Sequence, residues 1–296
     1  MKKNNPKVTI VVVPRERFSF SIESLKNICD ITSYDFDLIY VDGNSPGYLN
    51  RFLQKYSKEK GFKHIRTDNY LHPNQARNVG FKEVSDDTEY VVFLDNDVLV
   101  SKNWLTELVK CAEETGAALV GPLYLEGDVG EERIHMAGGE MVVDESDGIK
   151  RLSIDMHHHM KKVSELEEPL ERFQTDNIEF HAVLVRKSFL DKYGPLDDEL
   201  LTTREHVDIC LIAKEAGLPI YLEPKSVIHY VYPYPLKLTD FRFHFFRWDK
   251  QGTITTIKRF EEKWNIHLDK GRVEVINSRK KKAVKNYIKN KLGMAV

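Results

Sequence analysis

Tyr90-Val91-Val92-Phe93-Leu94-Asp95-Asn96-Asp97 is the stretch that decides the fold, because five consecutive apolar residues end directly in an acidic cluster. An uninterrupted apolar run that is rich in β-branched and aromatic residues is typical of a strand covered on both faces. In open α/β sheets, ligands bind beyond the carboxyl ends of such strands. The acidic cluster is therefore the first candidate for a functional site.

Strand and helix patterns alternate outward from this stretch. Strands are predicted at residues 8–13, 38–41, 63–66 and 117–120, and helices at residues 21–30, 48–60, 74–84 and 104–115. This alternation favours an α/β fold, in which a mostly parallel sheet carries helices on both faces.

The second half of the chain has a less regular pattern. Residues 134–143, 179–185, 220–222 and 227–230 predict strands, and residues 203–216 predict a helix. Residues 144–175 are polar and predict a long loop. After Pro233 and Pro235 the composition becomes aromatic and basic. We therefore expect one domain over residues 1–235, with halves at 1–100 and 101–235, and a helical C-terminal extension over 236–296.

Composition and charge exclude several classes of protein. The 296 residues carry a formal net charge of -2, which gives no overall attraction to nucleic acid. Cys29, Cys111 and Cys210 are too far apart to suggest a disulfide framework or a cysteine zinc site. No apolar stretch is long enough to cross a bilayer. We expect a cytoplasmic protein, with peripheral membrane contact as an alternative for the basic tail that begins at residue 279.

Polar residues follow three of the predicted strands. Pro14, Arg15 and Glu16 follow the first strand, Asp42 the second, and Asp95 and Asp97 the strand quoted above. Asp42 alone is equally consistent with an ordinary turn. Two carboxylates one residue apart repel each other, and a bound divalent cation would relieve that repulsion.

Six segments occur in the order of known family motifs, and together they resemble the family 2 glycosyltransferases, which have the GT-A fold. The motif-bearing segments are residues 8–14, Tyr40-Val41-Asp42-Gly43-Asn44-Ser45, Gln75-Ala76-Arg77-Asn78-Val79-Gly80, Phe93-Leu94-Asp95-Asn96-Asp97, residues 194–199 with Glu205-His206-Val207-Asp208, and residues 220–229. The resemblance implies a Rossmann-like, mixed but mostly parallel sheet, and a nucleotide diphosphate sugar as donor.

The resemblance also implies roles for individual residues. Asp42 would contact a uracil or thymine base, Arg77 would lie near the nucleotide, and Asp95 would face the ribose or a metal-bound water. Asp95 and Asp97, with His229, would hold Mn²⁺ or Mg²⁺. The remaining donor-side candidates are Pro14, Arg15, Glu16 and Asn96.

The catalytic base is where this sequence departs from the family pattern. The family usually has an aspartate where this chain has His206. His206 could act as the base, since a neutral imidazole accepts protons near pH 7. Glu205 could act instead, or the base could be lost. Asp208, His135 and Gly138 are candidates for the acceptor side, although Asp208 could also form a salt bridge and Gly138 could serve only a turn.

The function implied is metal-dependent transfer of a sugar, with inversion and with a UDP-sugar favoured, to a hydroxyl of a glycan or glycolipid. A nucleotidyltransferase acting on a sugar phosphate is one alternative, but residues 14–18 lack the glycine-rich phosphate loop expected of that class. A catalytically weak nucleotide-sugar-binding protein is the other. The aromatic stretch from Phe241 to Trp248 is expected to pack on the domain. The basic helix after it could pack there or lie on a membrane.

Overall fold

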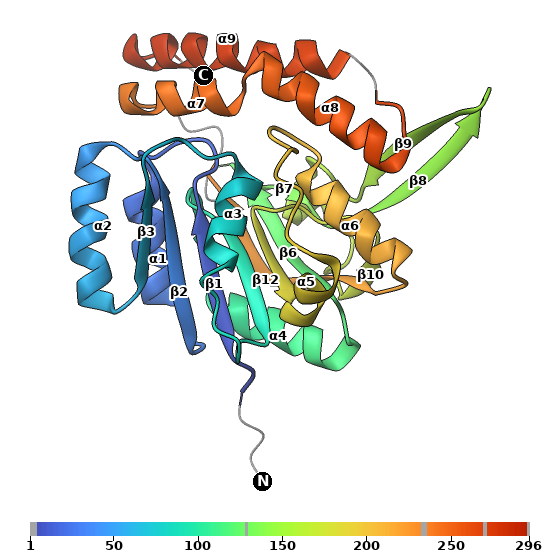
Figure 1. The fold of residues 1–296 in the computed structure, drawn as a ribbon, viewed down its shortest axis with the longest axis horizontal. Helices are drawn as coiled ribbons and strands as arrows, with labels where there is room; N and C mark the ends of the chain where they lie inside the picture. The colour runs from blue at the N-terminus through green and yellow to red at the C-terminus, as the bar shows by residue number, and fades with distance from the viewer. Residues whose placement is uncertain (1–4, 128–129, 232–235, 269–270, 295–296) are drawn as a thin grey trace.

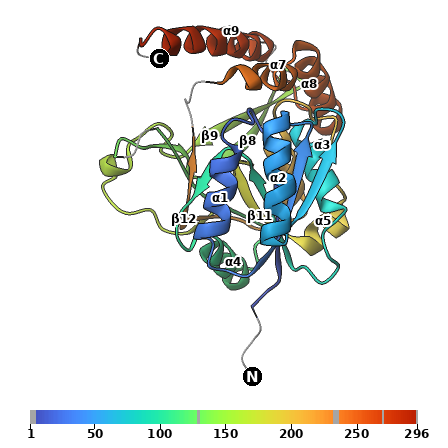
Figure 2. The same ribbon diagram turned by 90° about the vertical axis from the view of Figure 1, so that its left-hand side faces the viewer.

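A ten-stranded mixed sheet with helices on both faces forms the centre of the computed structural model, which describes residues 5–127, 130–231, 236–268 and 271–294 (Figures 1 and 2). Its strands are β1 (Val8–Val13), β2 (Phe36–Gly43), β3 (Lys63–Thr67), β4 (Tyr90–Asp95), β5 (Val98–Val100), β6 (Leu119–Glu126), β7 (Arg133–Met136), β10 (Phe173–Thr175), β11 (Ala182–Arg186) and β12 (Ile220–Tyr230). The helices are α1 (Ser21–Ile31), α2 (Gly47–Lys60), α3 (Pro73–Phe81), α4 (Trp104–Thr115), α5 (Lys187–Tyr193), α6 (Glu205–Glu215), α7 (Phe241–Arg247), α8 (Lys250–Trp264) and α9 (Gly271–Lys291).

The first half of the sheet is parallel, as the alternating pattern predicts. β1 lies between β2 and β4, with Val12 opposite Tyr40 and Val13 opposite Asp95. Every residue of β1 and β4 is buried, which explains their uninterrupted apolar runs. Parallel strands end at the same edge, so the polar residues that follow β1, β2 and β4 meet there.

The second half of the sheet mixes directions. β11 lies antiparallel to both β4 and β6, while β12 runs parallel to β6. The two short strands predicted at 220–222 and 227–230 are one strand, whose register shifts between Glu223 and Val227. Pro224 lies in this irregular part. Because proline cannot donate to a sheet ladder, it makes one strand look like two.

The prediction of a loop over residues 144–175 is wrong. β8 (Gly139–Ser146) and β9 (Ile149–Met156) form an antiparallel hairpin that projects from the domain (Figure 1), and β10 pairs with β12. Most of the hairpin's side chains are solvated, so its polarity resembles that of a loop. Alternating Leu152, Ile154 and Met156 were the available sign of a strand.

Helices α7, α8 and α9 lie across the edge where β1, β2 and β4 end (Figure 1). Phe243 of α7 is fully buried against the main core, and its ring centroid lies 4.6 Å from that of Phe18. The Asp240 carboxylate accepts hydrogen bonds from the backbone N–H groups of Phe18 and Ser19. The expected packing of the aromatic stretch is confirmed. The domain boundary predicted at residue 235 lies outside the described residues. No helix in the described part of the chain is long and apolar enough to span a membrane.

Candidate active site

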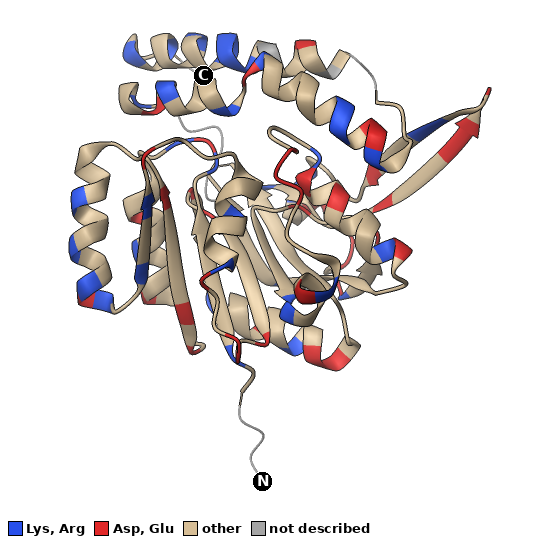
Figure 3. Ribbon diagram, in the orientation of Figure 1, with Lys and Arg blue, Asp and Glu red and all other residues tan. Residues whose placement is uncertain are grey.

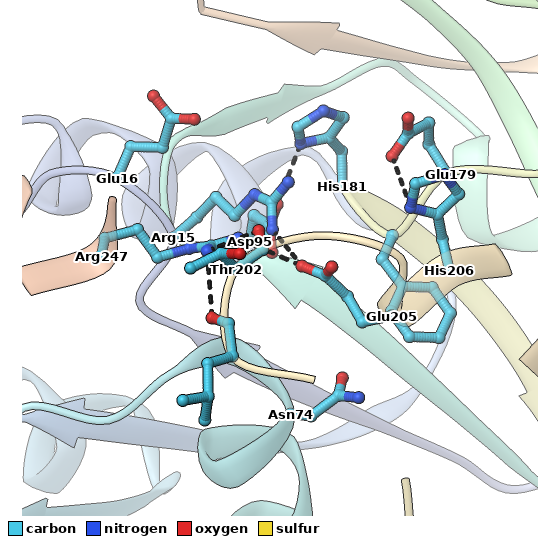
Figure 4. Close-up of polar contacts among 12 residues, drawn as sticks. Arg15, Glu16, Asn74, Asp95, Glu179, His181, Thr202, Glu205, His206 and Arg247 are labelled. Atoms are coloured by element: carbon cyan, nitrogen blue, oxygen red, sulfur yellow. Dashed lines mark hydrogen bonds and ion pairs between the residues drawn. The ribbon is translucent and has the colours of Figure 1, made fainter. Parts of the chain in front are cut away.

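A cavity of about 650 Å³ opens at the carboxyl edge of the sheet. The loop after β1, the segment before β11, the start of α6 and one side of α9 all contribute to its wall. Its polar lining includes Arg15, Glu179, His181, Glu205 and His206. Residues far apart in the sequence therefore share one cavity beside the acidic cluster, and the close-up in Figure 4 shows them converging.

Asp95 is fully buried and bound by three cationic or ionisable side chains. Its Oδ1 accepts a hydrogen bond from Arg77 Nη2 at 3.2 Å, and its Oδ2 lies 2.9 Å from His181 Nδ1. Arg15 Nε lies 3.5 Å from the same Oδ2. Arg77 is also fully buried and donates to the Phe180 carbonyl. Arg77 therefore holds the Asp95 end of β4 in place from α3, while Arg15 reaches the cavity wall (Figure 4).

Asp97 is fully buried, and neither of its carboxylate oxygens accepts a hydrogen bond from the described residues. Arg17 Nε lies 3.3 Å from Oδ2. Burial raises the pKa of Asp97 to about 7, with a further increase from the charge of Asp95, although Arg17 opposes both. A buried carboxylate that lacks hydrogen bonds is energetically unfavourable without a further cationic partner.

The Glu205 carboxylate is bound by two arginine side chains. Its Oε1 accepts hydrogen bonds from Arg15 Nη1 at 2.6 Å and from Arg247 Nη2 at 3.1 Å. Burial alone would raise the pKa of Glu205, but the charges of Arg15 and Arg247 outweigh it and lower that pKa to about 2. A carboxylate held this acidic is a weak proton acceptor, so the geometry disfavours Glu205 as the base.

His206 follows Glu205 at the start of α6 and faces the same cavity. Its Nδ1 lies 3.5 Å from Glu179 Oε2 (Figure 4). Burial lowers the pKa of His206, and the nearby Glu179 charge opposes this only in part. The pKa of Glu179 is well below its ordinary value because the charges of His206, His181 and His135 outweigh the effect of burial. A neutral imidazole beside an ionised carboxylate can accept a proton at its other nitrogen.

Histidines also line the wall beside Asp95. The His181 ring stacks on Tyr230 at 4.1 Å between centroids, and His135 lies 5.2 Å from His181. His135 Nδ1 lies 2.8 Å from Glu126 Oε2. The acceptor-side candidate His135 thus reaches the cavity. Glu179, His181 and Arg247 were missed in the sequence, where the first two lie beside or inside an apolar strand and the third in an aromatic helix.

Other donor-side candidates hold the loop after β1. Asn96 Oδ1 accepts a hydrogen bond from the Arg15 backbone N–H, and Asn96 Nδ2 donates to the Arg17 carbonyl and to Ser21 Oγ. Pro14 is buried beside Gly43. Glu16 lines the cavity, and its Oε1 lies 3.7 Å from Arg279 Nη1 of α9. Asn96 therefore fixes the backbone from which Arg15 and Arg17 extend.

Asp42 lies at the end of β2, apart from the lining of the large cavity. Its Oδ1 accepts a hydrogen bond from the Ser45 backbone N–H at 2.7 Å, and its Oδ2 binds Arg66 Nη1 and lies 3.4 Å from His64 Nε2. These contacts close the turn after β2, so the turn interpretation of Asp42 holds structurally. Contact between Asp42 and the nucleotide base of a donor stays a prediction.

Three further candidates, His229, Asp208 and Gly138, are absent from the cavity lining, as are Asp95 and Asp97, which lie buried beside it. His229 precedes Tyr230 on β12, and Tyr230 faces the cavity; alternate residues of a strand point to opposite faces. The described residues contain no group of three potential metal ligands, so Asp95, Asp97 and His229 are not assembled. Asp208 accepts hydrogen bonds from Trp264 Nε1 and Lys263 Nζ, which is the salt-bridge alternative. Gly138, at φ +74°, forms a tight turn against Thr175 and Phe173.

The matches to curated relatives cover only part of each chain. The chain is 27% identical over 111 residues to an uncharacterized glycosyltransferase of Rickettsia conorii, and 28% identical over 108 residues to one of Rickettsia bellii. These matches cover 38% and 36% of this chain but only 18% and 15% of the relatives. The chain thus matches less than a fifth of each relative's length.

Solved glycosyltransferase structures share the fold. A crystal structure of GalNAc-T7 with UDP, GalNAc and Mn²⁺ superposes with a TM-score of 0.60 at 16% identity, covering 92% of this chain and 57% of that one. A complex of S. aureus TarS residues 1–349 with UDP gives 0.52 at 13% identity, covering 91% and 69%. The expected GT-A-like architecture is confirmed. The model of glycosyl transferase family 2 matches residues 9–194, which is more than half of the chain, and the protein belongs to that family.

Proposed function

We propose that this protein is a metal-dependent, inverting glycosyltransferase that moves a sugar from a nucleotide diphosphate donor, a UDP-sugar being favoured, to a hydroxyl of a glycan or glycolipid. The observation that carries the proposal is the pair formed by His206 and Glu179 on the wall of a cavity that Arg15 also lines. In this proposal, His206 would be a proton acceptor and Arg15 a cation on the wall of one cavity.

His206 is the base in this scheme. The acceptor hydroxyl gives its proton to His206 Nε2, while the Glu179 carboxylate faces Nδ1 and stabilises the imidazolium that forms. The acceptor oxygen bonds to the anomeric carbon as the bond from that carbon to the diphosphate oxygen breaks, and the nucleoside diphosphate leaves with the electron pair. A single displacement of this kind inverts the anomeric centre.

The diphosphate needs positive charge as it leaves. Arg15 would supply part of it, and this role is supported by the guanidinium that lines the cavity and contacts Asp95 and Glu205. Fixed cationic groups that face developing negative charge are among the strongest contributions to catalysis.

Asp97 fits a divalent cation, because its two carboxylate oxygens accept no hydrogen bond from the described part of the chain and burial raises its pKa to about 7. Mg²⁺ is commonly bound by one or two carboxylates together with substrate phosphates, so a set of three protein ligands is not required. We propose Mn²⁺ or Mg²⁺ at Asp97, with Arg17 moving aside. When bound, the ion would act as a Lewis acid on the departing diphosphate.

Asp42 is proposed to contact the donor base. It is nearly fully buried at the end of β2, and its carboxylate is held by Ser45, His64 and Arg66. A uracil base is favoured because the crystal structures of GalNAc-T7 and TarS contain UDP.

The test is a thermal-shift screen of nucleoside diphosphates with and without Mn²⁺, followed by hydrolysis and transfer assays with the matching UDP-sugars. A ligand that binds the native state raises its apparent stability. We expect UDP with Mn²⁺ to give the largest shift. Absence of any nucleotide-dependent shift would contradict the proposal, and release of diphosphate from a nucleoside triphosphate and a sugar phosphate would favour a nucleotidyltransferase instead.

A further inference from the structure

The C-terminal helix α9 is strongly basic, in contrast to the rest of the chain. Its 21 residues contain eight Lys or Arg and one Glu, whereas the whole protein has a formal net charge of -2. The helix lies along the outside of the molecule over α7 (Figures 1 and 2), and its basic residues appear as a blue series in Figure 3. Concentrated positive charge of this kind attracts a polyanionic partner.

Apolar side chains form a strip on the solvent side of α9. Val284 and Ile288 lie four residues apart on one face of α9, and Leu292 continues this spacing in the turn directly after the helix, where its backbone N–H donates to the Ile288 carbonyl. Ile288 is 51% exposed and Leu292 is 68% exposed. With Met294 and with Phe245 of α7, they line a shallow groove of about 670 Å³. Apolar side chains that gather on a surface, rather than occurring singly, mark a docking site.

Lysines border this groove. The lysine side chains that line it together with the apolar residues are Lys280, Lys281, Lys285 and Lys289. A lysine side chain can cover apolar surface with its methylene groups while its ammonium group reaches outward. The surface therefore combines exposed aliphatic groups with cations that surround them.

The opposite side of α9 accounts for its attachment to the protein. Ile276 is buried, Tyr287 packs edge-on against Phe241 with 5.3 Å between ring centroids, and the Arg279 guanidinium lies 4.2 Å from the Trp248 ring centroid. These contacts hold α9 on α7 and the adjoining residues. The lysine-bordered groove is thus a second face of α9, although Lys280 on its border also packs within the chain, with its Nζ 5.8 Å from the Phe245 ring centroid and 4.0 Å from Asp249 Oδ1.

We propose that this surface, formed by Phe245, Val284, Ile288, Leu292 and Met294 with the four bordering lysines, docks on a membrane that contains anionic lipids. An amphipathic helix with aliphatic residues on one face and lysines beside them lies in the headgroup region of a bilayer. Its lysines are attracted to anionic headgroups. A single-stranded nucleic acid would instead call for aromatic stacking platforms, whereas this groove is mainly aliphatic.

Docking of this surface would bring the cavity close to the membrane. Ser278, Arg279 and Asn286 of α9 line the candidate active site from the other side of the same helix. The membrane-bound protein would therefore meet acceptors that are anchored in lipid. The delivery of lipid-anchored acceptors rests on the proposed function, whereas the docking on a membrane does not.

The experiment is co-sedimentation of the full chain with vesicles of phosphatidylcholine, with and without a fraction of phosphatidylglycerol. We expect binding to the anionic vesicles that weakens as salt is added. The paired change Ile288→Ser with Leu292→Ser should weaken it by about tenfold or more, because it removes aliphatic groups that would be buried in the bilayer. The paired change Lys281→Glu with Lys285→Glu should also weaken it.

Matched controls change the same chemistry elsewhere. Val142→Ser with Val143→Ser alters two exposed valines of the β8–β9 hairpin, and Lys55→Glu with Lys58→Glu alters two exposed lysines of α2. Both control proteins should bind vesicles like the unmodified protein. All altered residues are exposed, and thermal unfolding of each variant checks that the fold is kept.

Three outcomes would overturn the proposal: no binding to anionic vesicles, equal binding by the α9 variants and the unmodified protein, or tight binding of RNA that the apolar changes leave intact. The last outcome would assign the surface to nucleic acid. Transfer to a soluble acceptor should be unchanged in the Ile288 and Leu292 variant. Failure of membrane docking can therefore be distinguished from failure of the proposed transferase activity.

Discussion

The Nδ1 atom of His206 lies 3.5 Å from Oε2 of Glu179, and both side chains line the same cavity. His206 is the second residue of α6, where the positive end of the helix dipole disfavours an additional positive charge. Glu179 acts in the opposite sense and orients the ring. Burial and the helix N-terminus thus keep the imidazole neutral at rest, whereas Glu179 supports its charged form once a proton has been transferred.

Replacement of His206 tests the identity of the base. His206→Ala should lower kcat by roughly 10²–10⁴-fold while leaving donor affinity nearly unchanged, because a base acts on the acceptor proton only in the transition state. Steady-state kinetics with UDP-sugar, combined with UDP titration, separate the two effects. Equal losses in turnover and donor affinity would point to a structural role.

Glu179→Gln tests the orienting carboxylate. Burial holds the pKa of His206 below its ordinary value, so activity should persist below pH 6.5 and then fall as the imidazole becomes protonated. Glu179 opposes this shift, and removing its charge should move the acid limb of the kcat profile to still lower pH. The plateau should fall roughly 10-fold to 100-fold as the ring loses its orientation. An unmoved acid limb would count against a direct contact between the two side chains.

The strand ends could be located from the sequence, but their partners could not. Asp95 was identified because a buried strand ends in it, and Arg77 because the residues around it resemble a family motif. Glu179 lies just before an apolar strand and Arg247 in an aromatic helix, where nothing local distinguishes a cavity residue from a solvated one. Their positions depend on the long-range packing of β11 and α7. Which of Glu205 and His206 is the better candidate for the base depends on Arg15 and Arg247, which come from two distant segments and bind Glu205.

Glu205→Gln tests whether that glutamate serves charge balance. Its folded pKa of about 2, against an ordinary 4.5, corresponds to about 3 kcal/mol of stability at neutral pH. Because the folded pKa is lowered, this contribution is present above about pH 4.5 and is lost as pH falls through about 2. The variant should therefore have a lower free energy of unfolding than the unmodified protein at pH 7. The difference between the two proteins should become smaller as the pH is lowered. Urea unfolding at several pH values measures it, and Glu59→Gln on the exposed side of α2 should show no such gap.

Asp97→Asn tests the proposed cation site with a side chain of the same shape. The variant should lose the Mn²⁺-dependent part of UDP binding and most of its turnover, since an amide lacks the charge that holds a divalent ion. The loss should appear as the disappearance of the extra thermal shift that Mn²⁺ gives to UDP. Asp198→Ala, at an exposed position, is the control. An Mn²⁺ response equal to that of the unmodified protein would remove Asp97 from the site.

Long apolar patterns predicted the parallel half of the fold well, because β1, β2 and β4 are covered on both faces. The β8–β9 hairpin was missed for the opposite reason: it extends into solvent, so its residues carry little of the burial that makes a strand recognisable. β12 was divided in two at Pro224. The errors therefore fall where burial is weak or where a proline interrupts the ladder.

Gly80→Ala tests why a glycine ends the motif that carries Arg77. A Cβ atom at residue 80 would lie 2.2 Å from Val11 Cγ1 and 3.1 Å from Val41 Cγ2, so α3 would have to move away from β1 and β2. We expect a loss of about 1–3 kcal/mol in the free energy of unfolding. The midpoint of urea unfolding measures it, and Gly47→Ala, whose new methyl would meet only the end of the Arg51 side chain at 3.4 Å, is the control.

A double-mutant cycle assigns that loss to the contact itself. Val11→Ala removes the methyl group that Gly80→Ala would strike, so the alanine at residue 80 should cost less in that background than in the unmodified protein. Arg77 lies three residues before Gly80 on α3 and binds Asp95, so displacement of the helix should also reduce UDP binding in the single variant. If Gly80→Ala lowers the free energy of unfolding by the same amount in both backgrounds, the loss of stability does not come from the contact between α3 and β1. In that case the close approach of this helix would not be what positions Arg77 against Asp95.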